Sequence, residues 1–526
     1  MSKRIVDLSL TLKAFPGNVS SQPPPPYPHR EYIDEYFNRN DWMFYLDTQL
    51  FAIGREDNTC MDVICSIDPV GTHIEVYYND DRTMFKTLPP EKHWLARDIT
   101  NWPVSSFVGE ASIIDMSDVE AEETKPLKDI IKERSSHLKQ GDIVLCKTGY
   151  NEKFKGNEWS GEYYEKSFGP GPEALQWLVN EKNIKLFGID ARGPEDRRFK
   201  DIFKDVSKVA YPAHRVLHDN NVPILEVLGN LHKTSEKRIF LFCGTPVKAE
   251  KLSGGPTSVI GIEMNTGKIV DFTTYSKSPV RLNANKIQRI EPSEQDENIH
   301  RRLRIQKMTA VGLGYRYPGG MEEWGEFISF TSRLGTHIEV PFLSTENRSI
   351  PKNILKSVSD LKYTQLCGPA SVLNLTSKIS TNGEIKLEHL KEYTNQINSN
   401  DIVVLRTDFS DWNYHIPGNY KFSPKLTMKA AEWLLEKQIK MIITDFTSVD
   451  GNESAKENGG KVRHFLFQNN IPIVNMATNL WLLRKARVFL TCLPLSIPGL
   501  DASPVRLIAV EEYGEENSLL NLQLHE

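Results

Sequence analysis

The hexapeptide Gly-Thr-His-Ile-Glu-Val occurs twice in this chain of 526 residues, at positions 71–76 and at positions 335–340. An unbroken match of six residues, 264 positions apart, is rarely a coincidence. It predicts that the chain contains two copies of one folding unit, and internal repetition of this kind constrains the fold more strongly than any local pattern. Since each repeated segment carries His and Glu two positions apart, the repeat also bears on chemistry.

Further matches follow in the same order along both halves of the chain. Their offset falls from 264 at the histidines to 248 at the last prolines, as expected from small deletions in loops, which tolerate changes in length. The preserved order predicts two tandem homologous domains. The matched segments are 141–148 with 400–407, 186–190 with 441–445, 220–224 with 469–473, 230–231 with 479–480, and Pro246 and Pro256 with Pro494 and Pro504.

The composition, with 39% apolar and 25% charged residues, is typical of a soluble globular protein. A net charge of −5 gives no general attraction to nucleic acid or to anionic membranes. No apolar run approaches the roughly 18 residues of a membrane span, and Met1–Asp7 lacks the apolar core of a secretory signal. We therefore expect a cytoplasmic protein that binds neither nucleic acid nor membrane.

The six cysteines are scattered along the chain and form no Cys-x-x-Cys pair. Such spacing is typical of reduced thiols, most of them in the core, rather than of a disulfide framework or a zinc finger. The cysteines therefore agree with a cytoplasmic location. They are Cys60, Cys65, Cys146, Cys243, Cys367 and Cys492.

Within each copy, short β-branched runs alternate with helical stretches. The pattern predicts an α/β or mixed α+β fold for each domain. The expected strands of the first copy are 112–116, 143–146, 186–190 and 239–243, and the expected helix at 172–179 has its counterpart at 427–437.

The predicted domain boundaries follow from the repeat and from the polar segment between the copies. We place the first domain at residues 1–280, a linker at 281–304, and a degenerate second domain at 305–526. The first domain contains an insertion of about 38 residues, at about 18–56, with four consecutive prolines followed by an aromatic and acidic stretch. This insertion is either a stiff loop or a lid or partner arm.

The two repeated segments, together with several residues elsewhere in the chain, resemble the metal-dependent cyclase family that includes bacterial kynurenine formamidase and isatin hydrolase. The signature of that family, His-x-Gly-Thr-His-x-Asp-x-Pro-x-His, is similar to both 69–79 and 333–343. The family's other segments are similar to Asp7-Leu8-Ser9, to Gly188-Ile189-Asp190, to the pair His214 and Glu226, and to residues 501–506. The resemblance covers most of both halves. It implies two tandem swivelling β/β/α domains that form a pseudo-dimer within one chain, with further homo-oligomers left open.

The first copy keeps four potential metal ligands of the family. His73 and Glu75 lie two apart and so project from one face of a strand, and imidazole and carboxylate are good ligands for zinc or manganese. The resemblance adds His214 and Glu226 as further metal ligands, and as catalytic residues with Glu226 also the proton carrier. The sequence departs from the signature at Pro69, at Asn79 and, by one methylene, at Glu75. Asp80 and His218 are nearby substitutes for the missing proton-transferring histidine.

The second copy keeps His337 and Glu339 as candidate ligands but loses their partners. Arg333 and Leu343 replace the signature histidines, Arg463 replaces His214, and Asn475 replaces Glu226. Arginine does not deprotonate and cannot coordinate a metal. The arginines either bind a substrate carboxylate or phosphate or, as we favour, form internal ion pairs.

The two copies have kept different parts of the family pattern. The first keeps the candidate metal ligands but has Ser253 and Ser258 where the second keeps Asp501 and Arg506. Either both copies contribute to one composite site, or one copy is decaying without function. The sequence does not separate these two interpretations.

The resemblance implies a metal-dependent hydrolase of a small amide, lactam or lactone, in which metal-activated water attacks a carbonyl in the first domain. One alternative is a natural-product cyclase or dehydratase with the same fold. The other is a non-catalytic pseudoenzyme that acts as a binding or assembly protein, which the missing signature histidines favour. The implied cofactor is a divalent zinc or manganese ion and the implied partner is a small-molecule substrate.

Overall fold

The structure is a computed structural model. It describes residues 2–9, 52–55, 62–67, 71–76, 99–120, 123–153, 167–196, 212–244, 254–271, 273, 280–281, 309–316, 322–341, 356–380, 383–413, 422–451, 460–495, 497, 500–513 and 518–526.

The first half of the chain builds a nine-stranded sheet with the strand order β10-β4-β8-β7-β6-β5-β9-β11-β12. Strands β5 to β8 are parallel, and the strands on either side of them run antiparallel. The strands are β4 (His73–Glu75), β5 (Val108–Asp115), β6 (Ile143–Lys147), β7 (Leu186–Ile189), β8 (Ile224–Glu226), β9 (Arg238–Gly244), β10 (Gly254–Pro256), β11 (Ser258–Glu263) and β12 (Ile269–Asp271).

The second half builds an eight-stranded sheet with the order β1-β24-β16-β22-β21-β19-β17-β23. Because β23 also pairs with β24, this sheet closes on itself. The strands are β1 (Ser2–Asp7), β16 (His337–Glu339), β17 (Cys367–Asn374), β19 (Ile402–Arg406), β21 (Met441–Thr444), β22 (Ile473–Asn475), β23 (Arg487–Pro494) and β24 (Ala502–Tyr513).

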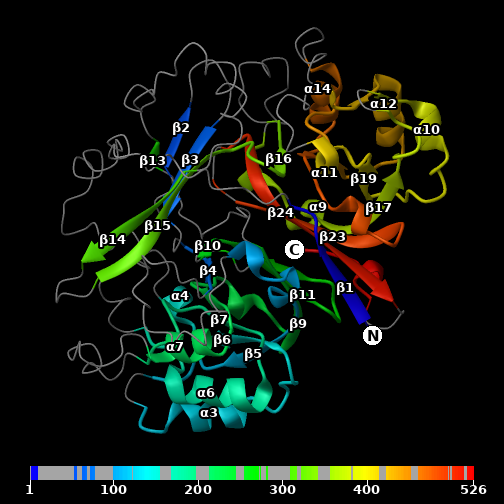
Figure 1. Cartoon of the computed structure of the whole chain (residues 1–526). Helices are drawn as coiled ribbons and strands as arrows, with labels where there is room; N and C mark the ends of the chain where they lie inside the picture. Colours follow the sequence, from blue (N-terminus) through cyan, green and yellow to red (C-terminus); the bar gives the residue numbers. More distant parts are fainter. Residues whose placement is uncertain are drawn as a thin grey trace.

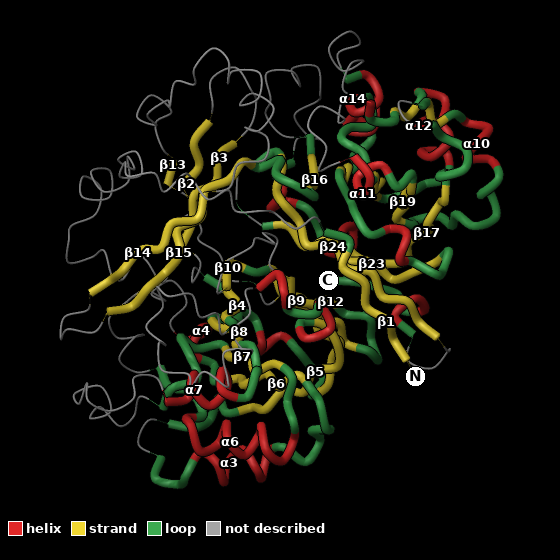
Figure 2. The backbone as a smooth tube through the Cα atoms, viewed as in Figure 1, coloured by secondary structure: helices red, strands yellow, loops and turns green. Residues whose placement is uncertain are grey.

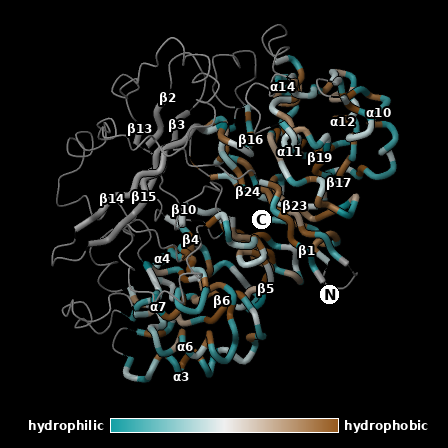
Figure 3. The backbone as a smooth tube through the Cα atoms, viewed as in Figure 1, coloured by the Kyte–Doolittle hydropathy of each residue, from teal (hydrophilic) through white to brown (hydrophobic). Residues whose placement is uncertain are grey.

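Helices cover the outer side of each sheet, and their apolar residues form a separate core against it (Figure 2). The first sheet carries α3 (Leu127–Arg134), α4 (Tyr150–Lys153), α6 (Gly171–Lys182) and α7 (Pro212–Asp219). The second carries α10 (Leu387–Lys391), α11 (Phe409–Asn413), α12 (Met428–Glu436) and α14 (Lys461–Gln468), with a two-stranded sheet of β18 (Glu384–Ile385) and β20 (Lys425–Leu426). The short helix α9 (Tyr363–Leu366) instead contributes Leu366 to the apolar core between the two sheets. Strands such as β6 and β23 are strongly apolar, as buried parallel or central strands should be (Figure 3).

The predicted elements of the first copy are confirmed to within a few residues. The expected strands correspond to β5, β6, β7 and β9, and the expected helices correspond to α6 and α12. The mixed α+β fold class is therefore confirmed. None of the described helices is long and apolar enough to cross a membrane.

The repeated asparagines explain how both copies turn at the same places. Asn221 and Asn470, which follow α7 and α14, have φ of 61° and 59°. Asn230 and Asn479 have φ of 55° and 59° and precede the 3₁₀ turns η5 (Leu231–Lys233) and η11 (Leu480–Leu482). Asparagine tolerates this left-handed conformation better than most residues, so the repeat preserves backbone geometry here.

The N-terminal strand of the chain belongs to the sheet of the second copy. Strand β1 pairs antiparallel with β24 along its whole length, from Ser2 opposite Tyr513 to Asp7 opposite Ile508, and the two strands run side by side in Figure 1. The sequence pattern does not predict that β1 joins the sheet of the other copy, because an alternating strand does not specify which sheet edge it joins.

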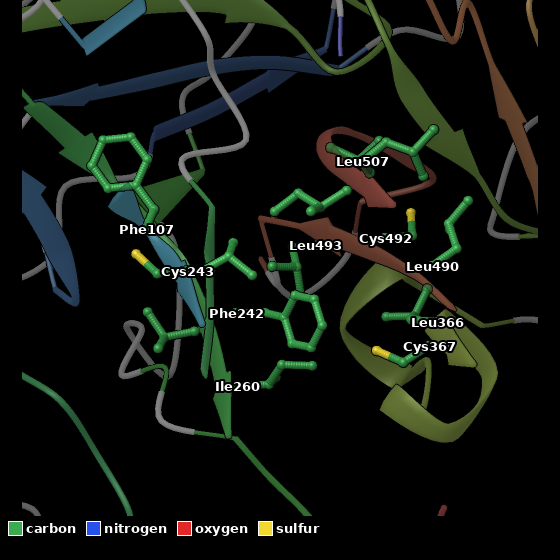
Figure 4. Packing of buried hydrophobic residues seen from close by; sticks show 14 of the residues in the cluster. Phe107, Phe242, Cys243, Ile260, Leu366, Cys367, Leu490, Cys492, Leu493 and Leu507 are labelled. Carbon is green, nitrogen blue, oxygen red and sulfur yellow. The ribbon is translucent and has the colours of Figure 1, made fainter. Parts of the chain in front are cut away.

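One apolar core joins the two sheets. It includes buried residues from β9 and β11 of the first copy and from β23 and β24 of the second. Phe242 stacks on Phe489 with ring centroids 5.8 Å apart. Leu493 and Ile260 lie on either side of Phe242 in this core (Figure 4). The two halves therefore share a buried apolar interface.

A third sheet, with the order β13-β2-β3-β15-β14, also contains strands from both halves. It consists of β2 (Ala52–Arg55), β3 (Asp62–Ile67), β13 (Val280–Arg281), β14 (Thr309–Arg316) and β15 (Glu322–Thr331). Strands β3 and β15 each end six residues before the histidine of the repeated hexapeptide. Of the predicted insertion only β2 lies within the described residues, and of the predicted linker only Arg281 does.

Candidate metal centre

His73 and Glu75 lie on β4, between β8 and β10 of the first sheet. His73 is opposite Glu226 of β8 on one side and Pro256 of β10 on the other. Because side chains alternate along a strand, His73 and Glu75 project from the same face, and Glu226 joins them from the adjacent strand. The predicted pairing of an imidazole with two carboxylates is therefore produced by the register of β4 and β8.

The three side chains form a group that could hold a metal ion. Nε2 of His73 lies 3.4 Å from Oε1 of Glu75 and 3.4 Å from Oε2 of Glu226. One potential ligand atom from each of the three residues lies within 4.8 Å of the others. Nε2 of His73 and Oε1 of Glu226 are buried without a hydrogen-bond partner among the described residues. Unsatisfied buried polar atoms carry an energetic penalty, and a cation coordinated by these atoms would remove it.

His214, the fourth predicted ligand, reaches this group from α7. Its Nε2 lies 3.1 Å from Oε1 of Glu226 and 3.7 Å from Oε2 of Glu75. It is not one of the residues whose ligand atoms all lie within 4.8 Å of one another. The structure thus places His214 in contact with the two carboxylates and beside the group of three.

Glu195 is a residue of this site that the sequence interpretation missed. Its Oε1 lies 3.0 Å from Nδ1 of His214, and its carboxylate accepts hydrogen bonds from the backbone N–H groups of Ala213 and His214. No spacing rule links Glu195 to His214. The repeat did carry a signal, because Asp450 accepts the equivalent N–H groups of Val462 and Arg463 in the second copy.

Glu195→Gln is expected to weaken divalent-metal binding and activity by roughly 10–100-fold, the usual effect of losing a carboxylate that orients a site histidine. The amide keeps the size of Glu195 but removes the charge beside Nδ1 of His214. Metal affinity, measured by competition with a chromogenic chelator, and kcat/KM test this. Asp450→Asn is the matched control in the second copy, and an equal loss in both variants would contradict a role for Glu195 at the site.

The charges of the first-copy site stabilise one another. Burial by itself lowers the pKa of His73 and of His214, but the neighbouring carboxylates outweigh burial and hold both values well above the ordinary one. Glu226 and Glu75 act on His73, and Glu195 and Glu226 act on His214. Burial would raise the pKa of Glu226, yet the two histidines lower it to about 2. Glu226 is therefore ionised at neutral pH.

Backbone geometry fixes the direction of the His73 ring. Its Nδ1 lies 2.9 Å from the carbonyl oxygen of Gly71, which has a φ of 59° that suits glycine. With Nδ1 donating to this carbonyl, Nε2 of a neutral ring is left as the metal-binding atom. On the other side of the site, a Cβ on Gly193 would lie 2.8 Å from Oε1 of Glu226. Glycine is therefore needed where this loop approaches the carboxylate.

The second copy repeats the frame of the site almost atom for atom. Nδ1 of His337 lies 2.8 Å from the carbonyl oxygen of Gly335, and His337 is opposite Asn475 in the register of β16 and β22. The hydroxyls of Thr72 and Thr336 both donate to backbone carbonyls at 2.7 Å, those of Val227 and Met476. The repeated hexapeptide therefore encodes the same local structure in each copy.

The side chains around that frame are different, and Arg333 is the main change. Its guanidinium lies 2.8 Å from Oε1 of Glu339 and 3.0 Å from Oδ2 of Asp501. Arg463 lies 3.4 Å from Oε2 of Glu339, and Asn475 donates to Oε1 at 3.2 Å. The interpretation favoured from the sequence, that Arg333 and Arg463 form internal ion pairs, is confirmed. Burial raises the pKa of Glu339, but Arg333 and then His337 and Arg463 outweigh it and hold that pKa well below its ordinary value.

The residues that distinguish the copies elsewhere also have structural contacts. Asp501 pairs with Arg333, and Arg506 pairs with Asp7 of β1 at 2.8 Å. The hydroxyl of Ser258 donates to the carbonyl of Pro494 across the interface between the halves. These contacts give no support to a composite site built around His73.

His218 is the described member of the two suggested substitutes for the missing proton-transferring histidine. Its ring is buried, with a centroid 6.1 Å from that of His214. Burial, and then the charge of His214, lower the pKa of His218 to about 4, so its ring is neutral at neutral pH. Pro69, Asn79, Asp80, Ser253 and Leu343 lie outside the described residues.

Four of the six cysteines are described, and all four are buried free thiols, as predicted. Burial raises the pKa of Cys146, Cys243, Cys367 and Cys492. A raised pKa disfavours the nucleophilic thiolate, so these residues serve the core. Cys65 lies on β3, and the structure does not describe its side chain; Cys60 lies outside the described residues.

Comparison with known families identifies the class of protein. The family model described as "Putative cyclase" matches residues 6–196 and 263–451, more than half of the chain. The chain therefore belongs to this cyclase family, and the two matched regions agree with a tandem duplication. The match supports an enzyme with a function of the hydrolase or cyclase type.

Three solved structures illustrate the relatives of this fold. Isatin hydrolase A from Labrenzia aggregata, bound to benzyl benzoate, is 21% identical and matches 39% of this chain and 83% of its own, with a TM-score of 0.34. Isatin hydrolase A from Ralstonia solanacearum has the same identity and TM-score and matches 39% and 82%. A predicted metal-dependent hydrolase from Bacillus stearothermophilus is 20% identical and matches 39% and 88%, with a TM-score of 0.30. No curated protein matches the chain. The family assignment rests on the sequence match and not on these superpositions.

Proposed function

We propose that the first copy holds one divalent metal ion and hydrolyses a small amide, lactam or lactone. The observation that carries the proposal is the group formed by His73, Glu75 and Glu226, with potential ligand atoms within 4.8 Å of one another. Membership of the cyclase family supports a hydrolase or cyclase of some kind. The relatives named as isatin hydrolases suggest a lactam ring as one substrate to test.

His73, Glu75 and Glu226 would hold the ion, and His214 lies beside them in contact with both carboxylates. When bound, a divalent ion lowers the pKa of water toward neutrality and polarises a carbonyl group. Borderline metals such as zinc and manganese accept this mixture of imidazole and carboxylate. Glu195 would keep His214 in position through its contact with Nδ1.

Proton transfer in this proposal is carried by Glu226 and His214. The carboxylate of Glu226 is ionised at neutral pH, because the two histidines lower its pKa to about 2, and its Oε1 would accept the proton from water. Nε2 of His214 lies 3.1 Å from that oxygen. A protonated His214 would donate its Nε2 proton to a leaving amine or alkoxide and would regain a proton from Glu226, which has taken one from water. A general base and acid of this kind contribute roughly 10²–10⁴-fold to a rate.

The test is metal analysis of the purified full chain, with His73→Ala and His337→Ala beside wild type. We expect about one zinc or manganese ion per chain in wild type and in His337→Ala, and loss of that ion in His73→Ala. The same three proteins would be assayed with an aryl formamide, an isatin-type lactam and a simple lactone. Absence of stoichiometric metal after growth and dialysis with both ions would refute the proposal. Loss of metal only in His337→Ala would move the site to the second copy.

A further inference from the structure

We propose that the guanidinium of Arg333 takes the place of a metal cation in the second copy. This copy is then a closed, metal-free site, and it becomes a divalent-cation site only when Arg333 is replaced by a residue without a positive charge. The inference concerns His337, Glu339 and Asp501 and depends on the proposed function only for the ion count of the first copy.

The second copy keeps the geometry of a metal site while its own side chains supply the cation. His337 has the same contact between Nδ1 and a backbone carbonyl as His73, so its Nε2 points to the same place. Nε2 of His337 lies 3.3 Å from Oε1 of Glu339, as Nε2 of His73 lies 3.4 Å from Oε1 of Glu75. The positions of the ring and the first carboxylate are therefore unchanged between the copies.

Arg333 bridges two carboxylates as a divalent ion would. One guanidinium nitrogen contacts Glu339 and the other contacts Asp501, and the side chains of these acids are only 6% and 3% exposed. Two buried carboxylates without a cation would be strongly destabilising. In the first copy, by contrast, the side chains in contact with Glu75 and Glu226 are the rings of His73 and His214, and imidazole can bind a metal. Arginine does not deprotonate and cannot bind one.

The remaining second-copy residues act in the same direction. Arg463 stands where the first copy has His214, 3.4 Å from Glu339, and Asn475 stands where it has Glu226. The first copy gathers three carboxylates, Glu75, Glu226 and Glu195, around two histidines. In the second copy, Arg333, Arg463 and Asn475 all contact one central carboxylate, that of Glu339. A cation is therefore favoured in one copy and excluded from the other.

Removing Arg333 should expose a latent ligand set. It would leave Glu339 and Asp501 without the guanidinium that bridges them, with Nε2 of His337 3.3 Å from Glu339. One imidazole and two carboxylates are a common ligand set for zinc and manganese. Histidine at position 333 would add a nitrogen ligand from the side of the site that Arg333 now occupies.

The experiment counts bound Mn²⁺ on the full chain by electron paramagnetic resonance, in a His73→Ala background that lacks the first site. We expect no tightly bound ion in His73→Ala and about one in His73→Ala/Arg333→His. His73→Ala/Arg333→Lys keeps the charge and is the matched control, expected to bind none. Circular dichroism before and after Mn²⁺ addition shows whether each variant is folded.

Three results would overturn the proposal. They are an ion in His73→Ala alone, a wild-type chain that binds two Mn²⁺ ions, and a folded His73→Ala/Arg333→His that binds none. The wild-type count needs no variant, so it remains decisive if the double variant does not fold. A wild-type chain that binds no ion, together with a His73→Ala/Arg333→His chain that binds one, would refute the proposed function and support the role of Arg333.

Discussion

Replacing Glu226 by glutamine is expected to lower kcat/KM by roughly 10²–10⁴-fold, the contribution of a general base or acid. The amide fills the same space but cannot accept the proton at Oε1 and is a weaker metal ligand. It also removes the charge that raises the pKa of both His73 and His214. Steady-state hydrolysis of the best substrate from the panel, together with the metal content of the same preparation, measures the effect.

The second copy offers a control for this substitution, because it carries an amide at the equivalent position. Asn475→Ala removes a hydrogen bond to Glu339 but leaves the first site untouched. We expect less than about a twofold change in kcat/KM for this variant, since surface and core changes remote from a site act mainly on stability. Comparable losses of activity in the two variants would mean that both copies serve one site. Unchanged activity in Glu226→Gln would remove Glu226 from the mechanism.

The sequence predicted one part of the site from local geometry and another from the family resemblance. His73 and Glu75 had to share a face because they lie two apart on a strand, and the structure shows that they do. Glu226 was predicted from the family resemblance and not from local geometry, and it joins them because β8 pairs with β4 in register. His214 was predicted from the family resemblance. Its Nε2 contacts Glu226, but His214 is not one of the three residues whose ligand atoms all lie within 4.8 Å of one another.

Glu195 could not be predicted in the same way, because its role depends on a tertiary contact. It lies 19 residues before His214, and the two meet only where the loop after β7 folds over the start of α7. A separation of 19 residues across a loop does not determine whether two side chains meet. Only a comparison of Glu195 with Asp450 across the two copies could have suggested that an acid is needed there.

The exchange of β1 was also beyond prediction, for a different physical reason. Tandem repeats suggest that each copy folds on its own segment, and the proposed boundary at residue 280 follows that assumption. A β-strand is satisfied by any compatible sheet edge, and here the edge of β24 is covered by β1 from the other end of the chain. The pairing makes the N-terminal residues part of the stability of the second copy.

Asp7→Ala is expected to destabilise the chain by about 3–5 kcal/mol, the usual effect of removing one partner of a buried ion pair. Arg506 is only 2% exposed, and its ion-pair partner among the described residues is Asp7, at 2.8 Å. Without that carboxylate, the guanidinium is buried beside the interface of the two halves with an uncompensated charge. Urea unfolding followed by tryptophan fluorescence and circular dichroism measures the loss, with the midpoint of each transition compared with wild type.

Two variants separate the loss of the charge from the loss of the strand. Asp7→Ala/Arg506→Met removes both charges, and apolar replacement of a buried pair is often close to neutral, so most of the stability should return. Lys125→Ala breaks a pair whose side chains are 42% and 64% exposed, and it should change stability by less than about 1 kcal/mol. If Asp7→Ala is as stable as Lys125→Ala, then the Asp7–Arg506 contact does not hold β1 against the second sheet. If the double variant is as unstable as Asp7→Ala, then Asp7 acts through the backbone of β1 and not through the charge of Arg506.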